Sequence, residues 1–294
     1  MALNGKQQSN KCLKHPFNLH ISLKRYKTRQ LLAPALLKMD LLQHYVPNLD
    51  IICKDFIEFI EKNLTFDKNR KCYVIDDFRQ LSYNFAFESI SSWCLNTRLG
   101  CLSTDTTPQV KCDGPVLIEA TKSLFESYQK LFYSSKLWKY IKTKPYRQLE
   151  SAENCIYNTL SKYVDSAINS KESTSKSLMN ELLQLNSLSP NEIKVTLMDF
   201  IIGGLFTVSN ALNFVCYHLA RNPKIQQKLY EEIIGVMDTN NEITIERLSR
   251  MPFLKACIKE SFRLTSTIPG IIRALPTDVN LSGYYVPKGL TTKQ

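Results

Sequence analysis

Apolar residues recur every three to four positions along most of this chain, which is the spacing of residues on one face of an α-helix. Between residues 41 and 64, Tyr45, Leu49, Ile52 and Phe56 fall on one such face. Comparable patterns predict helices over residues 41–64, 76–99, 116–131, 145–168, 189–220, 224–236 and 252–264. We therefore expect a mainly α fold.

The helix predicted over residues 189–220 has the most distinct start and the most apolar interior. Ser189, Pro190 and Glu192 match a capping box with proline at the first helical position. Nearly every residue in the middle is apolar, which is typical of a helix at the centre of a large core. The Asn-Pro pair that follows is expected to end the helix. No uninterrupted run of eighteen apolar residues occurs, so we expect no membrane-spanning helix.

The β component is small and is predicted near the end of the chain. Within residues 278–289, Ser282 and Gly283 separate two short apolar runs, which indicates a β-hairpin. Residues 1–23 are polar, contain turn-forming residues and show no sustained periodicity, so we expect an irregular segment there.

The net charge of +11 is concentrated at the start, where eight lysines and arginines precede the first acidic residue, Asp40. Such a segment is a mitochondrial transit peptide, a nucleic-acid-binding arm or a solvated basic face. The absence of interleaved aromatic residues disfavours nucleic-acid binding. Pro16 and Pro34 interrupt the amphipathic helix of a transit peptide. The charge therefore favours a solvated basic face.

The nine cysteines are scattered and none forms a C-x-x-C pair. This pattern disfavours a zinc site, and several of the cysteines lie within apolar helical patterns. We interpret them as small buried residues of a protein from a reducing compartment.

Two glycines, Gly203 and Gly204, interrupt the most apolar helix, and Thr207 follows one turn later. A glycine inside a helix costs about 1 kcal/mol relative to alanine. That cost is explained if a large flat group approaches the helix backbone there. It is equally explained by a close helix crossing, with Thr207 bonding back to a carbonyl one turn earlier.

Glu260 and Arg263 share one face of the last predicted helix, in an otherwise apolar stretch. In an apolar setting such a pair is costly unless other groups satisfy it, and it then fixes the arrangement of neighbouring elements. On a solvated face it contributes little. The pair alone does not decide between these alternatives.

The order of these features changes the interpretation. The Gly-Gly-x-x-Thr helix, the "RNP" stop, the "KACIKESFR" helix and the "GYYVPKG" hairpin follow one another as in the cytochrome P450 family, which the chain resembles from about Lys24 onward. "LSYNFAFESISSWCLNTRLGCL", "YHLARNPKIQQKLYEEI" and "ALPTDVNLSGYYVPKG" resemble its mitochondrial branch. Within that branch the similarity is to insect ecdysteroid hydroxylases, in particular a C-22 hydroxylase. It implies that residues 1–294 form a single partial domain, an internal portion of the cytochrome P450 fold.

The resemblance assigns roles to residues of both helices. Glu260 and Arg263 match the family's E-x-x-R pair, a structural latch beside the haem. Thr207 matches the threonine that helps deliver protons during oxygen activation. Gly203 and Gly204 stand where the haem cofactor approaches the helix.

Four basic residues receive roles from the same resemblance. Arg29 and Arg273 match arginines that pair with the haem propionates. Lys255 and Lys259 fall where mitochondrial members dock an acidic ferredoxin, a role suited to exposed lysines. An ordinary solvated helix face is the alternative for both lysines.

Three departures from the family pattern limit these expectations. Arg25 replaces the tryptophan of W-x-x-x-R, just after a segment, residues 9–23, that resembles an insertion. Phe206 replaces the acidic residue before the threonine, and a phenyl ring cannot relay a proton. The haem loop F-x-x-G-x-R-x-C-x-G does not occur in the 294 residues, so we expect that this chain supplies no axial cysteine to the iron.

The resemblance therefore implies a mitochondrial haem-thiolate monooxygenase that hydroxylates a sterol-like substrate with electrons from a ferredoxin. It also allows the full-length parent to associate with the inner membrane. The alternative is a non-catalytic truncated isoform or gene fragment that binds the ferredoxin. Neither interpretation involves nucleic acid.

Overall fold

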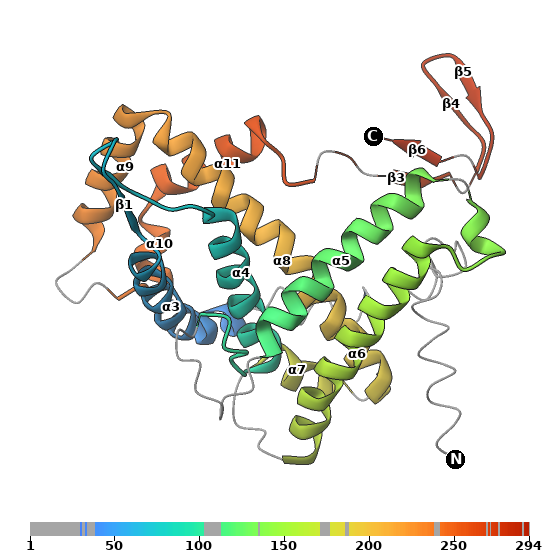
Figure 1. The fold of residues 1–294 in the computed structure, drawn as a ribbon. Helices are drawn as coiled ribbons and strands as arrows, with labels where there is room; N and C mark the ends of the chain where they lie inside the picture. The colour runs from blue at the N-terminus through green and yellow to red at the C-terminus, as the bar shows by residue number, and fades with distance from the viewer. Residues whose placement is uncertain are drawn as a thin grey trace.

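Helices dominate the computed structural model (Figure 1), which confirms the expected mainly α class with a small β component. The structure describes residues 30, 33, 39–102, 113–134, 136–170, 177–185, 188–237, 242–268, 270, 272–275, 277–289 and 291–293. The α-helices are α3 Met39–Lys62, α4 Phe78–Leu95, α5 Asp113–Tyr133, α6 Lys144–Ser170, α7 Leu178–Gln184, α8 Pro190–Ala220, α9 Pro223–Val236, α10 Ile245–Ser249 and α11 Pro252–Leu264. A 3₁₀ turn, η1 Lys136–Lys139, joins α5 to α6.

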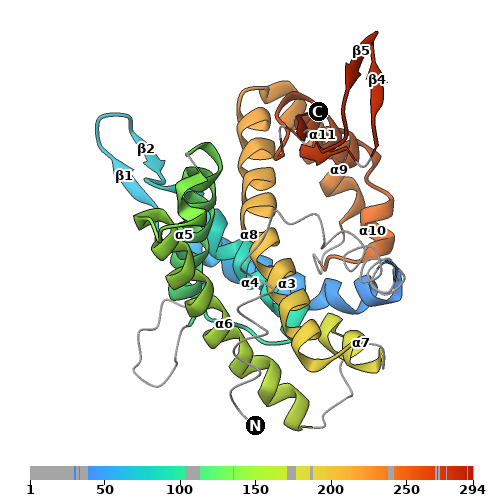
Figure 2. The same cartoon turned by 90° about the vertical axis from the view of Figure 1, so that its right-hand side faces the viewer.

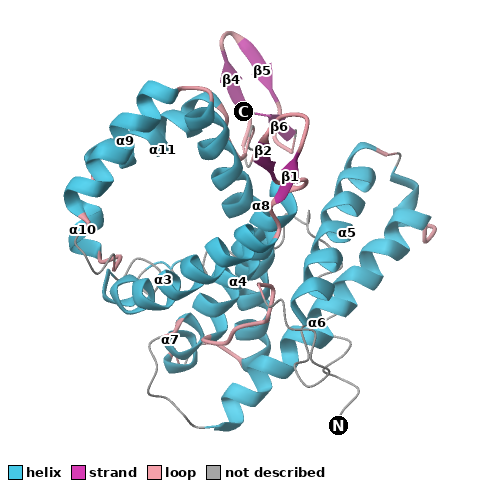
Figure 3. Cartoon of the chain, turned by 60° about the vertical axis from the view of Figure 1, so that its left-hand side comes forward, coloured by secondary structure: helices cyan, strands magenta, loops and turns pink. Residues whose placement is uncertain are grey.

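In the described part of the chain, the strands are three residues long and form three antiparallel pairs. They are β1 Thr65–Asp67 with β2 Cys72–Val74, β3 Ile272–Ala274 with β6 Thr291–Lys293, and β4 Val279–Leu281 with β5 Tyr284–Val286. Ser282 and Gly283, at φ 50° and 87°, make the turn between β4 and β5, as a tight hairpin turn requires. The hairpin predicted near the end of the chain is therefore present (Figure 3).

Helix α8 runs through the middle of the molecule, with α5 and α6 on one side and α9, α10 and α11 on the other (Figure 2). It crosses α4 closely, and α5 packs along α6. The main core lies where these four helices meet, and its fully buried side chains include Phe87, Leu117, Leu160, Leu197 and Ile201. Burying a side chain of this size contributes about 1.5–3 kcal/mol to folding, so this core fixes the path of α8.

The start of α8 is the capping box that the sequence predicts. The Ser189 side chain accepts from the Glu192 backbone N–H at 3.4 Å, and the Glu192 carboxylate accepts from the Ser189 N–H at 3.0 Å. A buried lysine one turn further on, Lys194, forms an ion pair with Asp165 of α6 at 2.6 Å. These bonds hold the first half of α8 against its neighbours.

The length and composition of α8 would also allow it to cross a membrane. The lack of eighteen consecutive apolar residues did not predict this property. Only 39% of the most apolar 18-residue stretch of α8 is buried. The buried residues of the helix lie between Ile193 and Ser209. Core helices of soluble proteins share this length and composition. The contacts with α4, α6 and α7 are those of a core helix.

A buried carboxylate fixes the turn after α4. Glu88 is fully buried and accepts from the Arg98 Nε at 2.8 Å and from the Cys101 backbone N–H at 2.9 Å. Arg98 also bonds to Asp55 of α3. A buried charge is stable only when it is paired in this way. Glu88 thus ties α3, α4 and the following loop together.

Candidate functional site

The two adjacent glycines of α8 face different surroundings. A Cβ added at Gly204 would lie 2.7 Å from Ile90 Cγ1, so glycine is needed there for α8 to cross α4 closely. A Cβ added at Gly203 would meet nothing within 4 Å, and this residue is exposed. The close-crossing interpretation is therefore right for Gly204. Gly203 leaves one side of the α8 backbone open.

Thr207 lies one turn after the open glycine. Its hydroxyl donates to the Gly203 carbonyl at 2.9 Å, which is the bond back along the helix that the sequence allowed. Phe206 turns toward the neighbouring helices instead, with its ring centroid 5.3 Å from that of Tyr83 on α4 and 4.8 Å from that of Phe125 on α5. Phe206 thus packs against aromatic rings of α4 and α5.

Helix α11 carries the Glu260–Arg263 pair on its solvent-exposed face. The Nε and Nη2 atoms of Arg263 donate to the two carboxylate oxygens of Glu260, at 2.7 and 2.6 Å. The side chains are 55% and 67% exposed for Glu260 and Arg263. The hydrogen bond from Arg263 lowers the pKa of Glu260. The pair is therefore bidentate, is formed within α11 and lies in a solvated setting in this chain.

Two further candidates, Lys255 and Lys259, lie one turn apart on α11 and are both exposed. Exposed cations on one helix face can attract an acidic protein at long range, and the attraction weakens with salt. The structure brings these lysines onto the same helix as Glu260 and Arg263.

The candidates for haem propionate binding are only partly described. Arg29 lies outside the described residues. The backbone of Arg273 is in β3 and pairs with Thr292 of β6, and its side chain lies outside the described part of the chain. Their role remains a prediction.

Sequence reasoning missed two residues that fasten α11 to its neighbours. Glu232 of α9 accepts from the Phe253 and Leu254 backbone N–H groups, both at 2.8 Å. His218, near the end of α8, hydrogen-bonds to Thr265, the C-cap residue of α11, at 3.0 Å. Glu232 was hard to identify from the sequence, because it lies in a charged helix in which most glutamates are solvated.

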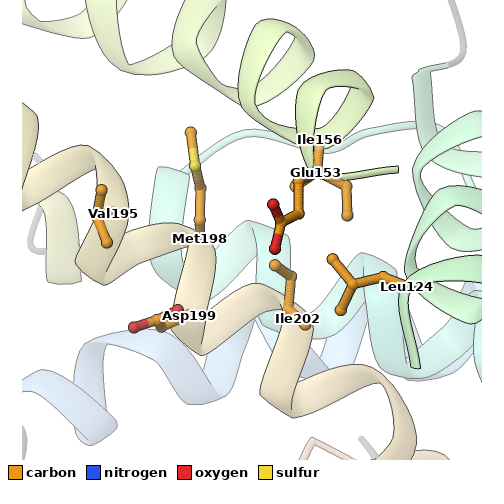
Figure 4. A pocket seen from close by; sticks show the side chains of 7 residues that line it. All are labelled: Leu124, Glu153, Ile156, Val195, Met198, Asp199 and Ile202. Carbon is orange, nitrogen blue, oxygen red and sulfur yellow. The ribbon is translucent and has the colours of Figure 1, made fainter. Parts of the chain in front are cut away.

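A small cavity lies between α5, α6 and α8 (Figure 4). Its volume is about 20 Å³, which is enough for one water molecule. The lining residues are Leu124, Glu153, Ile156, Val195, Met198, Asp199 and Ile202. Tyr128 donates to Glu153 at 3.0 Å, and burial raises the pKa of that carboxyl to about 7. The cavity is too small for a substrate.

The sequence and the fold of the chain are those of a known class of haem protein. The chain belongs to the cytochrome P450 family, whose model, described as Cytochrome P450, matches residues 5–292.

Several of its relatives are mitochondrial by name. Probable cytochrome P450 12b2, mitochondrial, from Drosophila melanogaster is 32% identical over 263 residues, which are 87% of this chain and 47% of that protein. Ecdysone 20-monooxygenase from the same organism is 30% identical over 273 residues, 90% of this chain and 49% of that protein. The chain thus spans about half the length of the curated relatives it matches.

The fold agrees with this assignment. The solved structure of retinoic acid-bound cyanobacterial CYP120A1 aligns with 92% of this chain and 55% of that chain, with a TM-score of 0.67 at 20% identity. Likeness at this identity shows a shared fold, and it confirms that the chain is a portion of the cytochrome P450 fold.

Haem is the cofactor of cytochrome P450s. The open backbone beside Gly203 and the nearby Thr207 hydroxyl fit one face of such a flat group. Three of the described thiols fit less well as axial ligands, because burial raises the pKa of Cys53, Cys94 and Cys216 and so favours the protonated form. Within the described residues, no cluster of three or more His, Cys, Asp or Glu side chains could hold a metal ion.

Proposed function

We propose that this chain forms part of a mitochondrial haem-thiolate monooxygenase that hydroxylates a sterol-like substrate. The observation that carries the proposal is the open glycine of α8, Gly203, with Thr207 one turn away, in a chain of the cytochrome P450 family. When bound, the haem of this family supplies the oxygen activation that inserts one oxygen atom into a C–H bond.

The residues of α8 have distinct proposed roles beside such a haem. Gly203 allows the flat group to approach the helix backbone, because no side chain stands in the way. Thr207 donates its hydroxyl proton to the Gly203 carbonyl, with 2.9 Å between the two oxygens, which keeps the hydroxyl beside the open glycine. Phe206 packs against Tyr83 and Phe125 and excludes water from its part of the helix. We expect proton delivery to be slower than with an acidic residue at this position.

The substrate class and the electron donor are proposed from the resemblance and from the relatives. One relative is named Ecdysone 20-monooxygenase, which supports an ecdysteroid-like substrate, and the C-22 hydroxylase resemblance concerns the same class. The exposed Lys255 and Lys259 support an acidic ferredoxin as electron donor. In this proposal Glu260 and Arg263 are the structural latch, and Arg29 and Arg273 bind the haem propionates.

The alternative is a non-catalytic chain that binds the ferredoxin without turnover. It is supported by the raised pKa values of the Cys53, Cys94 and Cys216 thiols, which disfavour the thiolate form that binds iron. In both cases we propose that residues 1–294 are one partial cytochrome P450 domain.

A reduced, carbon monoxide-treated absorbance spectrum of the purified chain with added haem separates the two. We expect no thiolate-haem band from this chain alone, because burial raises the pKa of the Cys53, Cys94 and Cys216 thiols and disfavours their thiolate forms. A clear thiolate-haem band would overturn that expectation and would discard the non-catalytic alternative.

Membrane association of the parent protein has a candidate surface at the α5–α6 turn. Tyr133, Leu137, Tyr140 and Ile141 are exposed there, with Tyr140 86% and Ile141 66% exposed. Exposed lysines and an arginine follow at the start of α6. Aromatic and aliphatic side chains beside basic residues are suited to the interface of an anionic membrane.

We expect the Tyr140→Ser, Ile141→Ser double variant to bind anionic phospholipid vesicles about tenfold more weakly, because it loses apolar area that the membrane would bury. Tyr73→Ser is the matched control, since Tyr73 is 69% exposed on β2 at the opposite end of the molecule (Figure 1). Co-sedimentation with vesicles measures both. Equal losses in the two variants would contradict the assignment of this surface.

A further inference from the structure

Helix α11 begins without a cap of its own. Its N-cap residue, Met251, makes no side-chain capping bond, and Pro252 occupies the first turn. The first N–H groups of a helix have no partner within the helix and must be satisfied from elsewhere. The start of α11 therefore depends on a group from another element.

That group is the carboxylate of Glu232, which reaches across from α9. One carboxylate oxygen accepts from the Phe253 N–H and the other from the Leu254 N–H, each at 2.8 Å. Hydrogen bonds to a charged acceptor are shorter and stronger than neutral ones. The negative charge also suits the positive end of the helix dipole. Glu232 thus satisfies two backbone donors at once from a fixed position on a different helix.

Other contacts place the same two helices side by side. The Lys228 ammonium lies 4.6 Å from the centroid of the Phe253 ring. At the opposite end of α11, the hydrogen bond between His218 and Thr265 joins the helix to α8. Helix α11 is therefore fastened at its start by α9 and at its end by α8.

We propose that Glu232 is a positioning residue, which caps α11 from the neighbouring helix and sets where the exposed face of α11 stands. If the proposed function is correct, on which this extension rests, Glu232 thereby positions Lys255 and Lys259 for the ferredoxin. It also orients the Glu260–Arg263 pair. Glu232 touches neither substrate nor haem and acts through α11.

Hydrogen exchange of the α11 amides in the full chain tests the cap. We expect Glu232→Ala to speed exchange at Phe253 and Leu254 roughly tenfold, because the loss of a helix cap costs about 1 kcal/mol or more. Glu232→Gln keeps one neutral acceptor and should give a smaller increase. Glu231→Ala is the control, since the exposed Glu231 accepts from Gln227 within α9. Unchanged exchange in both Glu232 variants would overturn the proposal.

The reactivity of Cys257 supplies a second readout, which reports the charge of Glu232 beside α11. The pKa of this thiol is raised by burial and, to a smaller extent, by the charge of Glu232. Glu232→Gln should therefore speed alkylation of Cys257 relative to Glu231→Gln, with helix content unchanged. A Cys257 rate that stays the same in Glu232→Gln would count against the placement of this charge beside α11.

Titration of each variant with an adrenodoxin-type ferredoxin separates this inference from the proposed function. The exchange and alkylation experiments require neither haem nor ferredoxin. If Glu232→Ala loosens α11 while the unmodified chain fails to bind ferredoxin, the positioning role stands and the partner assignment fails. If ferredoxin binds the unmodified chain, Glu232→Ala should weaken that binding severalfold more than Glu231→Ala does. Equal binding of ferredoxin by Glu232→Ala and Glu231→Ala would contradict the proposal that Glu232 positions the ferredoxin-binding lysines.

Discussion

At the scale of single residues, two adjacent glycines of α8 have different surroundings. Gly203 and Gly204 are adjacent and chemically identical, yet Gly204 is pressed against Ile90 while Gly203 faces open space. The sequence predicted that these glycines mattered and offered two reasons for them. It could not assign one reason to each glycine, because the rotation of α8 relative to α4 depends on contacts between distant parts of the chain.

This difference gives a matched pair of substitutions. We expect Gly204→Ala to lower the free energy of unfolding by about 1–3 kcal/mol, since the new methyl group would overlap Ile90. Gly203→Ala should instead leave it unchanged or raise it by up to about 1 kcal/mol, the helix propensity gained by replacing glycine. Urea unfolding of both variants measures the difference. Equal effects would show that the two glycines do not have distinct surroundings.

At the scale of elements, the longer helices were predictable and the short ones were not. The apolar spacing places α3, α4, α5, α6, α8, α9 and α11 within a few residues of their observed bounds. Helices α7 and α10, with 7 and 5 residues, and the three-residue strands β1 and β2 are too short to show a period. The cap that Glu232 provides to α11 was also missed, because it joins two helices whose relative position no local pattern encodes.

The packing of α6 against α8 should depend on pH through Glu153. Burial raises the pKa of this carboxyl from 4.5 to about 7 in the folded chain. The folded state thus retains a proton that the unfolded chain releases, and its stability falls as pH rises from 4.5 to about 7. Glu153→Gln, which cannot ionise, should lack this loss.

Urea unfolding midpoints at about pH 5 and about pH 8 test this expectation. The stability of Glu153→Gln relative to the unmodified chain should be greater at the higher pH. Glu126→Gln is the control, since Glu126 is 68% exposed on α5. The same pH dependence in the unmodified chain and in Glu153→Gln would rule out Glu153 as its source.

At the scale of the whole molecule, the chain presents two helices of a cytochrome P450 domain with the faces that carry the candidate residues exposed. The open side of α8 at Gly203 and the Glu260–Arg263 pair of α11 are both in contact with solvent. The matched relatives are about twice as long as this chain. We propose that the remaining half of such a domain covers these faces, which explains why an ion pair on an apolar helix is solvated here.

The most direct test joins this chain in frame to the part of the Drosophila melanogaster 12b2 relative that follows the matched region, which is 47% of that protein's length. We expect the fused protein to bind haem and to give the thiolate-haem band after reduction and treatment with carbon monoxide. The band should disappear when the cysteine of the added haem loop is replaced by serine. A fused protein that is folded and helical but binds no haem would contradict the proposal that this chain forms part of a haem-thiolate monooxygenase.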